Sequence, residues 1–293
     1  MLQHIVNGLT LGALYALIAT GYSLVFSMVG MINLAYGSIL TIGALLAYQV
    51  AVQMGMGNLV GMLVSLVVCG LMGLLTDVAA VEPVRRQRLP IYFALLSTFG
   101  VNTVFQNIAE NITLKAWARE FRPFPPPLTV NMYEVGPVQF SNMDVIVLAV
   151  VLVFMVLLHQ FMTRTWGGRA VVVTASDPEV AEVMGIDTRR VIAFMFFVSC
   201  ALASVAGAMI GMYYGMVSSS LGTSPGTKGF IASLIGGRGQ ITGAVLGAMI
   251  LGLLESLAAG VIGSSYRDLV AFIVLILMFL VKPTGILGSA ETR

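Results

Sequence analysis

Long apolar stretches, separated by short polar segments, run along almost the whole chain. Each stretch approaches the roughly 20 residues with which an α-helix crosses a bilayer core of about 30 Å. In lipid every backbone polar group needs an internal partner, so such stretches must be helices. The pattern predicts eight membrane-spanning helices, at residues 5–28, 31–53, 59–78, 91–112, 143–162, 191–215, 241–261 and 266–282.

Two glycine-rich segments depart from this pattern. Residues 221–239 form a ninth, weaker segment that carries Lys228, and residues 30–37 interrupt an early apolar run with two glycines, an asparagine and a tyrosine. Transporters use short, glycine-interrupted helices where backbone groups face a pathway. A loose similarity between residues 39–46 and 241–246 suggests an internal repeat with one interrupted helix in each half.

The positions of Lys and Arg predict how the chain is oriented, because short cytoplasmic loops carry an excess of both. Arginines follow the third span at 85–88 and the fifth span at 164–190, and Lys282 follows the last span. These segments are expected to be cytoplasmic. In 113–142 acidic residues balance the basic ones, and we place this loop outside. The N-terminus is then outside and the C-terminus inside, which requires that 221–239 also crosses, as a broken or half-length helix.

The composition supports a membrane protein. Of the 293 residues 58% are hydrophobic and only 10% are charged, whereas a soluble domain is about 25% charged. The expected fold class is an all-α, polytopic transmembrane helical bundle, with residues 1–293 in a single domain. Cys69 and Cys200 lie in apolar runs and are expected to act as small hydrophobic residues. The bilayer is an expected partner, and nucleic acid is not.

Residues that carry catalysis or bind nucleotides are scarce. The chain has two histidines, His4 and His159, and it contains no HExxH, GxSxG or GxxxxGK[ST] motif. We therefore expect no enzymatic activity, no bound metal or cofactor, and no ATP binding by this chain itself. Energy for uphill transport would have to come from a partner or from an ion gradient.

Polar residues inside the apolar runs are candidates for a transport pathway, because such groups need a partner or a polar cavity. Asn33 and Tyr36 could line a pathway or bond to a neighbouring helix. Lys228 could attract a substrate carboxylate or reach the membrane interface. Glu255 could serve an ion-coupled carrier. Because no basic partner is evident within a span, we favour a hydrogen-bonded or snorkelling glutamate near the end of its span.

The segment 164–190 is densely charged, with eight charged residues against none in the first 76 positions. The run Asp-Pro-Glu at 177–179 is typical of a helix N-terminus, and Gly185 is suited to end the helix. This predicts a helix of about two turns at the cytoplasmic surface. It would be either a docking element for a soluble partner or only an amphipathic connector.

Several motifs, in the same order along the chain, resemble the permeases of branched-chain amino acid ATP-binding-cassette importers. The segment 168–187 is similar to their cytoplasmic coupling motif, and 30–37 to their early broken motif. Segments 7–17, 228–244 and 283–288 also match. The resemblance covers nearly the whole chain and fits the LivH type better than the LivM type.

The resemblance implies one transmembrane subunit of an importer in the bacterial inner membrane, for branched-chain or other hydrophobic amino acids. Relatives serve urea, amides or small aromatic acids. Two ATPase subunits would dock at the loop 169–187, a periplasmic binding protein would deliver substrate, and the second permease would be of the LivM type or another copy. Alternating access would be the mechanism.

The motifs and the resemblance together assign two sets of residues. The substrate pathway is assigned to Asn33, Tyr36, Gly37, Lys228, Gly236 and Gly237. The docking surface for the ATPases is assigned to Arg169, Ala170, Asp177, Glu179, Ala181, Glu182, Gly185 and Ile186. The family commonly has a histidine where this chain has Tyr36, so a Tyr36 that faces the substrate would imply a shifted specificity. A secondary carrier or a passive channel stays an alternative, although only Glu255 is available as an ion-site carboxylate.

Overall fold

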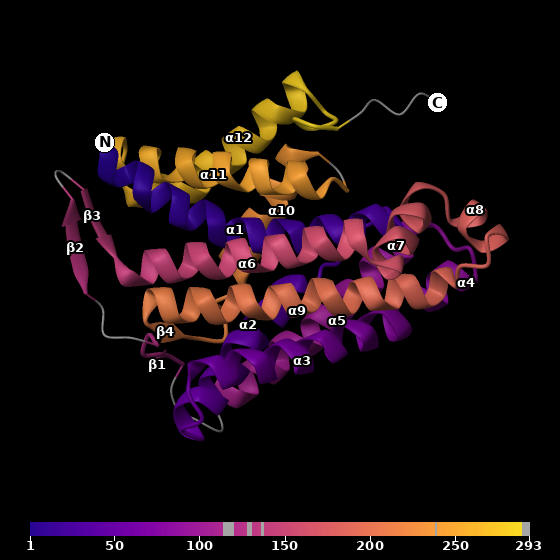
Figure 1. The fold of residues 1–293 in the computed structure, drawn as a ribbon, viewed down its shortest axis with the longest axis horizontal. Coiled ribbons are helices and arrows are strands. Elements are labelled where there is room, and N and C mark those ends of the chain that lie inside the picture. Colours follow the sequence, from indigo (N-terminus) through magenta and orange to yellow (C-terminus); the bar gives the residue numbers. More distant parts are fainter. Residues whose placement is uncertain (114–119, 128–130, 136–137, 238, 289–293) are drawn as a thin grey trace.

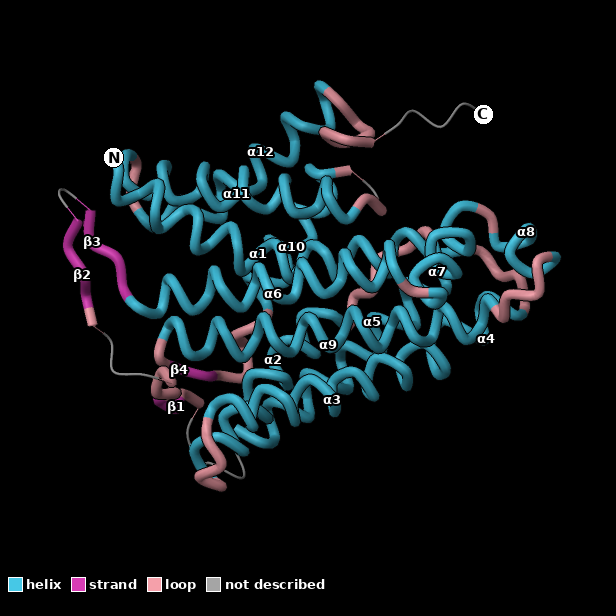
Figure 2. Tube along the Cα trace, in the orientation of Figure 1, coloured by secondary structure: helices cyan, strands magenta, loops and turns pink. Residues whose placement is uncertain are grey.

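The protein is a bundle of long helices, as the sequence predicts (Figures 1 and 2). The computed structural model describes residues 1–113, 120–127, 131–135, 138–237 and 239–288. The helices are α1 (Leu2–Val29), α2 (Tyr36–Tyr48), η1 (Gln49–Gln53), α3 (Asn58–Thr76), η2 (Asp77–Val81), α4 (Glu82–Arg86), α5 (Ile91–Asn111), α6 (Asn142–Arg164), α7 (Trp166–Ser176), α8 (Pro178–Val183), α9 (Thr188–Tyr214), α10 (Thr223–Gly236), α11 (Ile241–Val261), η4 (Ser264–Tyr266) and α12 (Arg267–Val281). The strands are β1 (Arg122–Pro123), β2 (Met132–Val135), β3 (Val138–Ser141) and β4 (Met216–Val217).

Most of the predicted spans coincide with a single helical stretch. Within the described residues, seven stretches are long and apolar enough to cross a membrane. The remaining predicted span, 91–112, corresponds to α5, which has 21 residues but is not among the seven. Its second half is rich in amide side chains, Asn102, Gln106, Asn107 and Asn111, and these lower its hydropathy. Asn102 and Gln106 are partly buried, so their side of α5 is suited to polar surroundings inside the bundle.

Two helices form the centre of the bundle. Helix α1 is buried along most of its length and packs against α6, α9, α10 and α11, while α9 also packs against α2 and α3. The outer helices α6 and α12 expose most of their apolar side chains. This distribution is the reverse of a soluble protein and suits a bundle whose outer surface contacts lipid.

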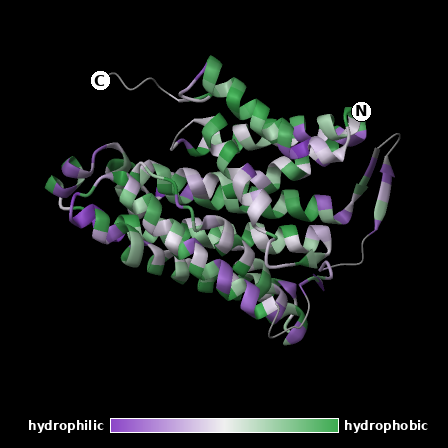
Figure 3. Cartoon of the chain, turned by 180° about the vertical axis from the view of Figure 1, so that it is seen from behind, coloured by the Kyte–Doolittle hydropathy of each residue, from purple (hydrophilic) through white to green (hydrophobic). Residues whose placement is uncertain are grey.

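The two ends of the bundle differ in character (Figures 1 and 3). One end holds the N-terminus, the antiparallel hairpin of β2 and β3, and the short antiparallel pairing of β1 with β4. The Gln3 amide donates to the Gln139 carbonyl oxygen (2.7 Å) and accepts from the Gln139 backbone N–H (2.8 Å). The other end holds α4, α7 and α8, where Arg189 Nε lies 2.7 Å from Glu82 Oε1. Both internal arginine-rich loops thus share one end.

Two helices end in the same way and are followed by a break. The C-cap residues Gly30 after α1 and Gly215 after α9 are left-handed, with φ of 70° and 71°. After each break the chain turns back into the bundle and begins a new helix, α2 or α10. Because α1 and α9 run in opposite directions (Figure 1), the two broken units are antiparallel. The unit that corresponds to α1 and α2 is therefore α9 and α10.

This arrangement corrects the repeat suggested by residues 39–46 and 241–246. The helix that follows the second break is α10, whereas Ile241 begins the full-length helix α11 after a turn. Residues 39–46 lie in the helix that follows the first break, whereas residues 241–246 begin α11, so the two similar segments do not occupy equivalent positions in the two units.

The predicted half-length helix is present as α10. Helix α10 has 14 residues, about 21 Å at 1.5 Å per residue, which is shorter than a bilayer core of about 30 Å. Residues 215–222, which connect α9 to α10, supply the rest of the distance. Their strand β4 is held by β1, so the extended part begins at the end that holds the N-terminus.

Candidate functional site

The two breaks meet inside the bundle. The backbone N–H of Gly222, at the start of α10, donates to Thr41 Oγ1 on α2 (2.9 Å). Thr41 Oγ1 in turn donates to the carbonyl oxygen of Gly37 (3.2 Å). The free backbone N–H at the start of α10 is thus satisfied by a threonine of α2, as buried polar groups require.

Glycine is required at this crossing because the two backbones touch. A Cβ atom on Gly222 would lie 2.6 Å from Thr41 Oγ1 and would overlap the carbonyl oxygen of Gly37. A Cβ atom on Gly226 would lie 3.1 Å from the Cα of Gly37. Gly37, which was predicted to line the pathway, therefore first serves the close approach of α2 and α10.

A cavity of about 370 Å³ lies beside this crossing. Hydroxyl, amide and aromatic groups dominate its wall, and none of the lining side chains is charged. The lining residues are Tyr22, Ile32, Leu34, Gly37, Ser38, Asn102, Gln106, Thr223, Gly226, Thr227 and Phe230. Such a wall offers hydrogen bonds to a polar solute and apolar contacts to a hydrophobic part, without a fixed charge to trap it.

Of the predicted pathway residues, Gly37 lines this cavity. Asn33 and Tyr36 lie behind it and are fully buried. Asn33 Oδ1 accepts from the Ala35 N–H (3.0 Å), and so it shapes the first break. The Tyr36 hydroxyl donates to the Ser199 carbonyl oxygen of α9 (3.1 Å). The centroid of the Tyr36 ring lies 4.3 Å from that of Tyr22. Tyr36 therefore packs against a residue of the cavity wall and does not line the cavity itself.

Gly236 and Gly237 lie elsewhere, at the turn between α10 and α11. Gly236 packs against the backbone of Gly243, and Gly237 faces Gly288 of the C-terminal segment. The backbone N–H groups of Ile286 and Leu287 donate to the carbonyl oxygens of Ile235 and Gly236 (2.9 and 3.1 Å). The structure therefore separates these two glycines from the cavity and places them where the chain end closes on α10.

Lys228 is engaged in a buried ionic cluster. Its Nζ lies 2.7 Å from Glu255 Oε1 on α11 and 2.8 Å from Asp268 Oδ1 on α12. The Tyr15 hydroxyl of α1 donates to Glu255 Oε2 (3.0 Å). Lys228 is 7% exposed and Glu255 is 1% exposed. The cluster joins α1, α10, α11 and α12 around one lysine.

This cluster changes the interpretation of Glu255. The expectation of a hydrogen-bonded glutamate is met, but the premise that no span carries a basic partner was wrong. Lys228 comes from the broken helix, 27 residues away, and sequence reasoning treated the two residues separately. The pairing also occupies Lys228, which does not line the cavity.

The predicted short helix is present as α8. Asp177 is its N-cap, and Asp177 Oδ1 accepts from the N–H groups of Glu179 and Val180 (2.9 and 3.1 Å). Pro178 occupies the first turn, and Gly185 follows the helix with φ of 79°. The capping chemistry seen in the sequence therefore determines where this helix begins and ends.

Helix α8 stands at the tip of the bundle with one side free (Figure 1). Ala181 is fully buried, whereas Val180, Val183 and Met184 are exposed, Val183 by 89%. Of the predicted docking residues, Arg169, Asp177, Glu179, Glu182 and Gly185 are exposed, Ile186 is half-buried, and Ala170 and Ala181 are buried. The free side is thus an apolar patch bordered by carboxylates.

The position of α8 is fixed to the transmembrane helices. The Thr188 hydroxyl donates to Glu182 Oε1 (2.8 Å). One residue on, Arg189 pairs with Glu82 of α4. Force applied to α8 would therefore reach both α9 and the α3–α4 helix.

Most of the cavity wall escaped the sequence analysis. Tyr22, Thr223 and Phe230 carry no pattern that marks them, because their meeting depends on packing. Asn102 and Gln106 did offer a signal, since two amides four residues apart share one face of a helix within a predicted span.

Comparison with known proteins agrees with this architecture. A family model described as branched-chain amino acid transport system / permease component matches residues 4–279. The chain is 36% identical over 305 residues to the high-affinity branched-chain amino acid transport system permease protein LivH of Escherichia coli K12, covering 100% of this chain and 97% of that protein. It is 35% identical over 304 residues to the permease BraD of Pseudomonas aeruginosa, with the same coverage.

The likeness extends to a probable LivH permease of Methanocaldococcus jannaschii, at 24% identity over 94% of this chain and 89% of that protein. The broken helices, the apolar outer surface and the projecting helix α8 are features of a multi-pass membrane protein built to transport. The chain accordingly belongs to the family of branched-chain amino acid transport system permease components.

Proposed function

We propose that this chain is one of two permease subunits of an ATP-binding-cassette importer in a bacterial inner membrane, and that it carries branched-chain or other hydrophobic amino acids. A periplasmic binding protein would deliver the solute at the end that holds the N-terminus. Two ATPases would act at the end that holds α8. The second permease would be of the LivM type.

One observation carries this proposal: α8 projects from the arginine-rich end with an apolar and acidic surface that no other described residue covers. Val180, Val183 and Met184 are exposed there, beside Glu179. The chain has no phosphate-binding motif of its own. A short, capped helix that is tied to two transmembrane helices is suited to take up motion from a soluble ATPase.

The proposed mechanism is alternating access. ATP-driven closure of the ATPases moves α8, and the contact between Glu82 and Arg189 transmits the movement to α3–α4 and α9. The crossing of α2 with α10 then opens toward one end or the other. A ligand shifts such an equilibrium only through different contacts in the two states, and the cavity beside the crossing is placed to make them.

The docking step is tested by co-purification from membranes that contain the complete set of subunits. Val183→Asp places a charge on the most exposed apolar side chain of α8 without touching its cap. We expect the ATPases to accompany the parent and to be lost from this variant. Val52→Asp, at the opposite end of the bundle, is the matched control and should retain them.

Retention of the ATPases by Val183→Asp would exclude α8 as the docking site. Absence of ATPases from the parent, in mild detergent, would overturn the importer assignment as a whole.

The cavity supports a small hydrophobic amino acid as the solute. The ring of Phe230 and the side chain of Leu34 suit an aliphatic side chain, while Asn102, Gln106 and Thr227 suit the amino and carboxyl groups. Glu255 is paired with Lys228, which leaves it poorly placed to serve an ion-coupled carrier. Urea, an amide or an aromatic acid is the alternative within the same importer type.

Uptake of labelled leucine, isoleucine and valine into vesicles that contain the complete importer identifies the solute. We expect uptake to depend on ATP and on the binding protein, and we expect urea not to compete with it. Gln106→Leu should lower uptake, whereas Asn107→Leu, next to it on the exposed side of α5, should not. Competition by urea, or uptake driven by an ion gradient alone, would contradict the proposal.

A further inference from the structure

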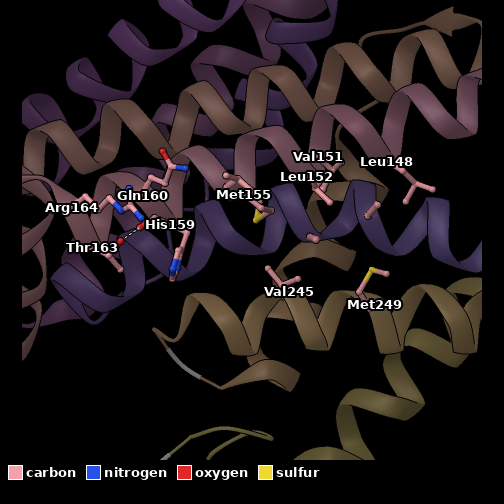
Figure 4. Close-up of a pocket in the computed structure, with 13 residues that line it drawn as sticks. Leu148, Val151, Leu152, Met155, His159, Gln160, Thr163, Arg164, Val245 and Met249 are labelled. Atoms are coloured by element: carbon pink, nitrogen blue, oxygen red, sulfur yellow. Dashed lines mark hydrogen bonds between the residues drawn. The ribbon is translucent and has the colours of Figure 1, made fainter.

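A second hollow, separate from the crossing of α2 and α10, lies on the outer surface of the bundle. Its two lobes, of about 700 and 640 Å³, share the lining residues Met155, His159 and Val245. Together they form one groove between α6 and α11, and Figure 4 shows the lobe of about 700 Å³. Ala13 and Ala16 of α1 form its floor, and their small side chains leave the groove deep.

The groove is apolar along most of its length and polar at one end. Leu148, Val151, Leu152 and Met155 line one wall, and Val245 and Met249 line the other. At the end nearest α7, the side chains of His159, Gln160, Thr163 and Arg164 gather (Figure 4). Gln240 and Thr242 add an amide and a hydroxyl from the start of α11.

The charge at the polar end has one sign. Arg164 contributes a guanidinium group, and none of the residues that line either lobe is acidic. Among the described residues, Arg164 makes no salt bridge. It lies at the end of the bundle that holds both internal arginine-rich loops, which the distribution of Lys and Arg places at the cytoplasmic face.

The length of the groove fits a single leaflet. Gln160 and Leu148 are 12 residues apart on α6, which corresponds to about 18 Å at 1.5 Å per residue. Half of a bilayer core is about 15 Å. The apolar wall can therefore accompany one acyl chain from the headgroup level to the bilayer midplane.

The walls fit a lipid better than another helix. Helices that pack in a membrane use small residues at the contact, but the rim of the groove on α6 presents Leu148, Leu152 and Val156. Helix α11 turns its glycines inward, with Gly252 against α1 and Gly247 against α10. These two glycines of α11 are thus already used inside the bundle.

We propose that the groove between α6 and α11 binds an acidic phospholipid of the cytoplasmic leaflet. One acyl chain lies over Ala13 and Ala16, and the phosphate lies against Arg164, His159 and Gln160. The site does not depend on the transported solute. Because the lipid touches both α6 and the start of α11, it holds these two outer helices together next to the arginine-rich end.

Native mass spectrometry of the complex tests this site after reconstitution with equal amounts of phosphatidylglycerol and phosphatidylcholine of matched acyl chains. We expect the full-length chain, with its accompanying subunits, to retain phosphatidylglycerol preferentially. Arg164→Gln should reduce that preference about fivefold, the effect of one basic side chain at an anionic membrane surface. Arg190→Gln removes an arginine outside the groove and should leave the preference unchanged.

A second pair of variants tests the acyl chain. Val245→Trp fills the groove and should abolish retention of both lipids, while Leu157→Trp, on the exposed side of α6 outside the groove, should not. Equal retention of the two lipids by the parent would overturn the proposal, as would an unchanged preference in Arg164→Gln. These readouts need neither transport nor ATPase docking, so they are independent of the proposed function.

The competing occupant, a second permease, is tested by cross-linking. Cys69 and Cys200 are fully buried, so a cysteine placed at the rim by Leu152→Cys reacts alone. A short cross-link from this position to another permease in the assembled complex would mean that the groove is a subunit interface, and would overturn the lipid site. Absence of such a cross-link supports it.

Discussion

The charged residues inside the bundle hold helices together through ion pairs. Lys228, Glu255 and Asp268 bring a lysine from a broken helix together with carboxylates of two further helices. Removing one partner of a buried ion pair leaves the other charge unpaired in surroundings of low polarity, which is strongly destabilising. The cluster therefore fixes α10, the shortest crossing element, against its neighbours.

Lys228→Met tests this role. The variant leaves Glu255 buried with only the Tyr15 hydroxyl as a partner, and we expect the free energy of unfolding to fall by about 3–5 kcal/mol. Adding Glu255→Gln should recover part of this loss, since it removes the unpaired charge. Unfolding of the purified protein in detergent, followed by circular dichroism, measures both.

Asp268→Asn is the matched control for Lys228→Met. The Asp268 side chain is 66% exposed, and exposed ion pairs contribute about 0–1 kcal/mol. A loss as large as that of Lys228→Met would show that the outer carboxylate, and not the buried one, holds the lysine.

At the scale of elements, the broken helices and α8 are positioned by specific local chemistry. The crossing of α2 and α10 depends on backbone contact at Gly37 and Gly222, with Thr41 between them. Helix α8 depends on its cap, since six residues form too short a helix to be stable without tertiary support. We therefore expect a single substitution to disturb each element, at Gly222 for the crossing and at Asp177 for α8.

Gly222→Ala should disturb the crossing. The added methyl group meets Thr41 Oγ1 and the Gly37 carbonyl oxygen, and overpacking of this kind costs about 1–3 kcal/mol. We expect the protein to insert into membranes but to lose most of its transport in the vesicle assay.

The control for this variant is Gly100→Ala on α5, where a Cβ atom meets open space. This change should be neutral or stabilising by up to about 1 kcal/mol. Full transport by Gly222→Ala would mean that the two half-helices need no close contact.

Asp177→Ala and Asp177→Ser separate the cap of α8 from its charge. Serine caps a helix about as well as aspartate does, whereas replacement by alanine costs about 0.5–2 kcal/mol. We expect Asp177→Ala to weaken ATPase co-purification and Asp177→Ser to preserve it. If both variants lose the ATPases equally, the carboxylate itself makes the contact.

At the scale of the whole molecule, the ends of the helices define two faces. Within the described part of the chain, nine segments run between these faces when α10 and residues 215–222 before it are counted together. An odd number places the N-terminus and the C-terminal segment at opposite faces, in agreement with the orientation expected from the arginine-rich loops. The hairpin of β2 and β3 and helix α8 are the exposed markers of the two faces.

Cysteine labelling checks this topology. Glu134→Cys, on β2, should react with a membrane-impermeant maleimide in intact cells with a permeabilised outer membrane. Val183→Cys, on α8, should react only in inside-out vesicles. Native Cys69 and Cys200 are buried, which keeps the background low. Labelling of both positions from the same side would contradict the nine-crossing arrangement.

Elements whose signal is local were predictable. The apolar runs predicted the positions of the spanning helices to within a few residues, except at 31–36, where the break delays α2 to Tyr36. The Asp177–Glu179 run and Gly185 predicted α8. The loop 164–190 and the C-terminus are expected at the same face, so the number of crossings between them must be even. This predicted a crossing at 221–239, although the segment is too short and too polar to be recognised by hydropathy.

Residue roles that depend on distant partners were not predictable. Tyr36 and Asn33 were expected either to face a pathway or to bond to a neighbouring helix. A single sequence does not indicate that Tyr36 donates to Ser199 or that Asn33 accepts from Ala35. The pairing of Lys228 with Glu255, which lie 27 residues apart, could not be predicted from the sequence.

The sequence by itself determined that the chain crosses a membrane many times, which loops share a face, and where a short capped helix stands at that face. Those features follow from hydropathy, charge and capping, which act within a few residues. Only the tertiary structure decided which polar groups meet: the cavity beside Gly37, the cluster around Lys228, and the groove ending at Arg164. Each arises where helices distant in sequence pack together, because side-chain direction and helix crossing, and not composition, determine which groups come within bonding distance.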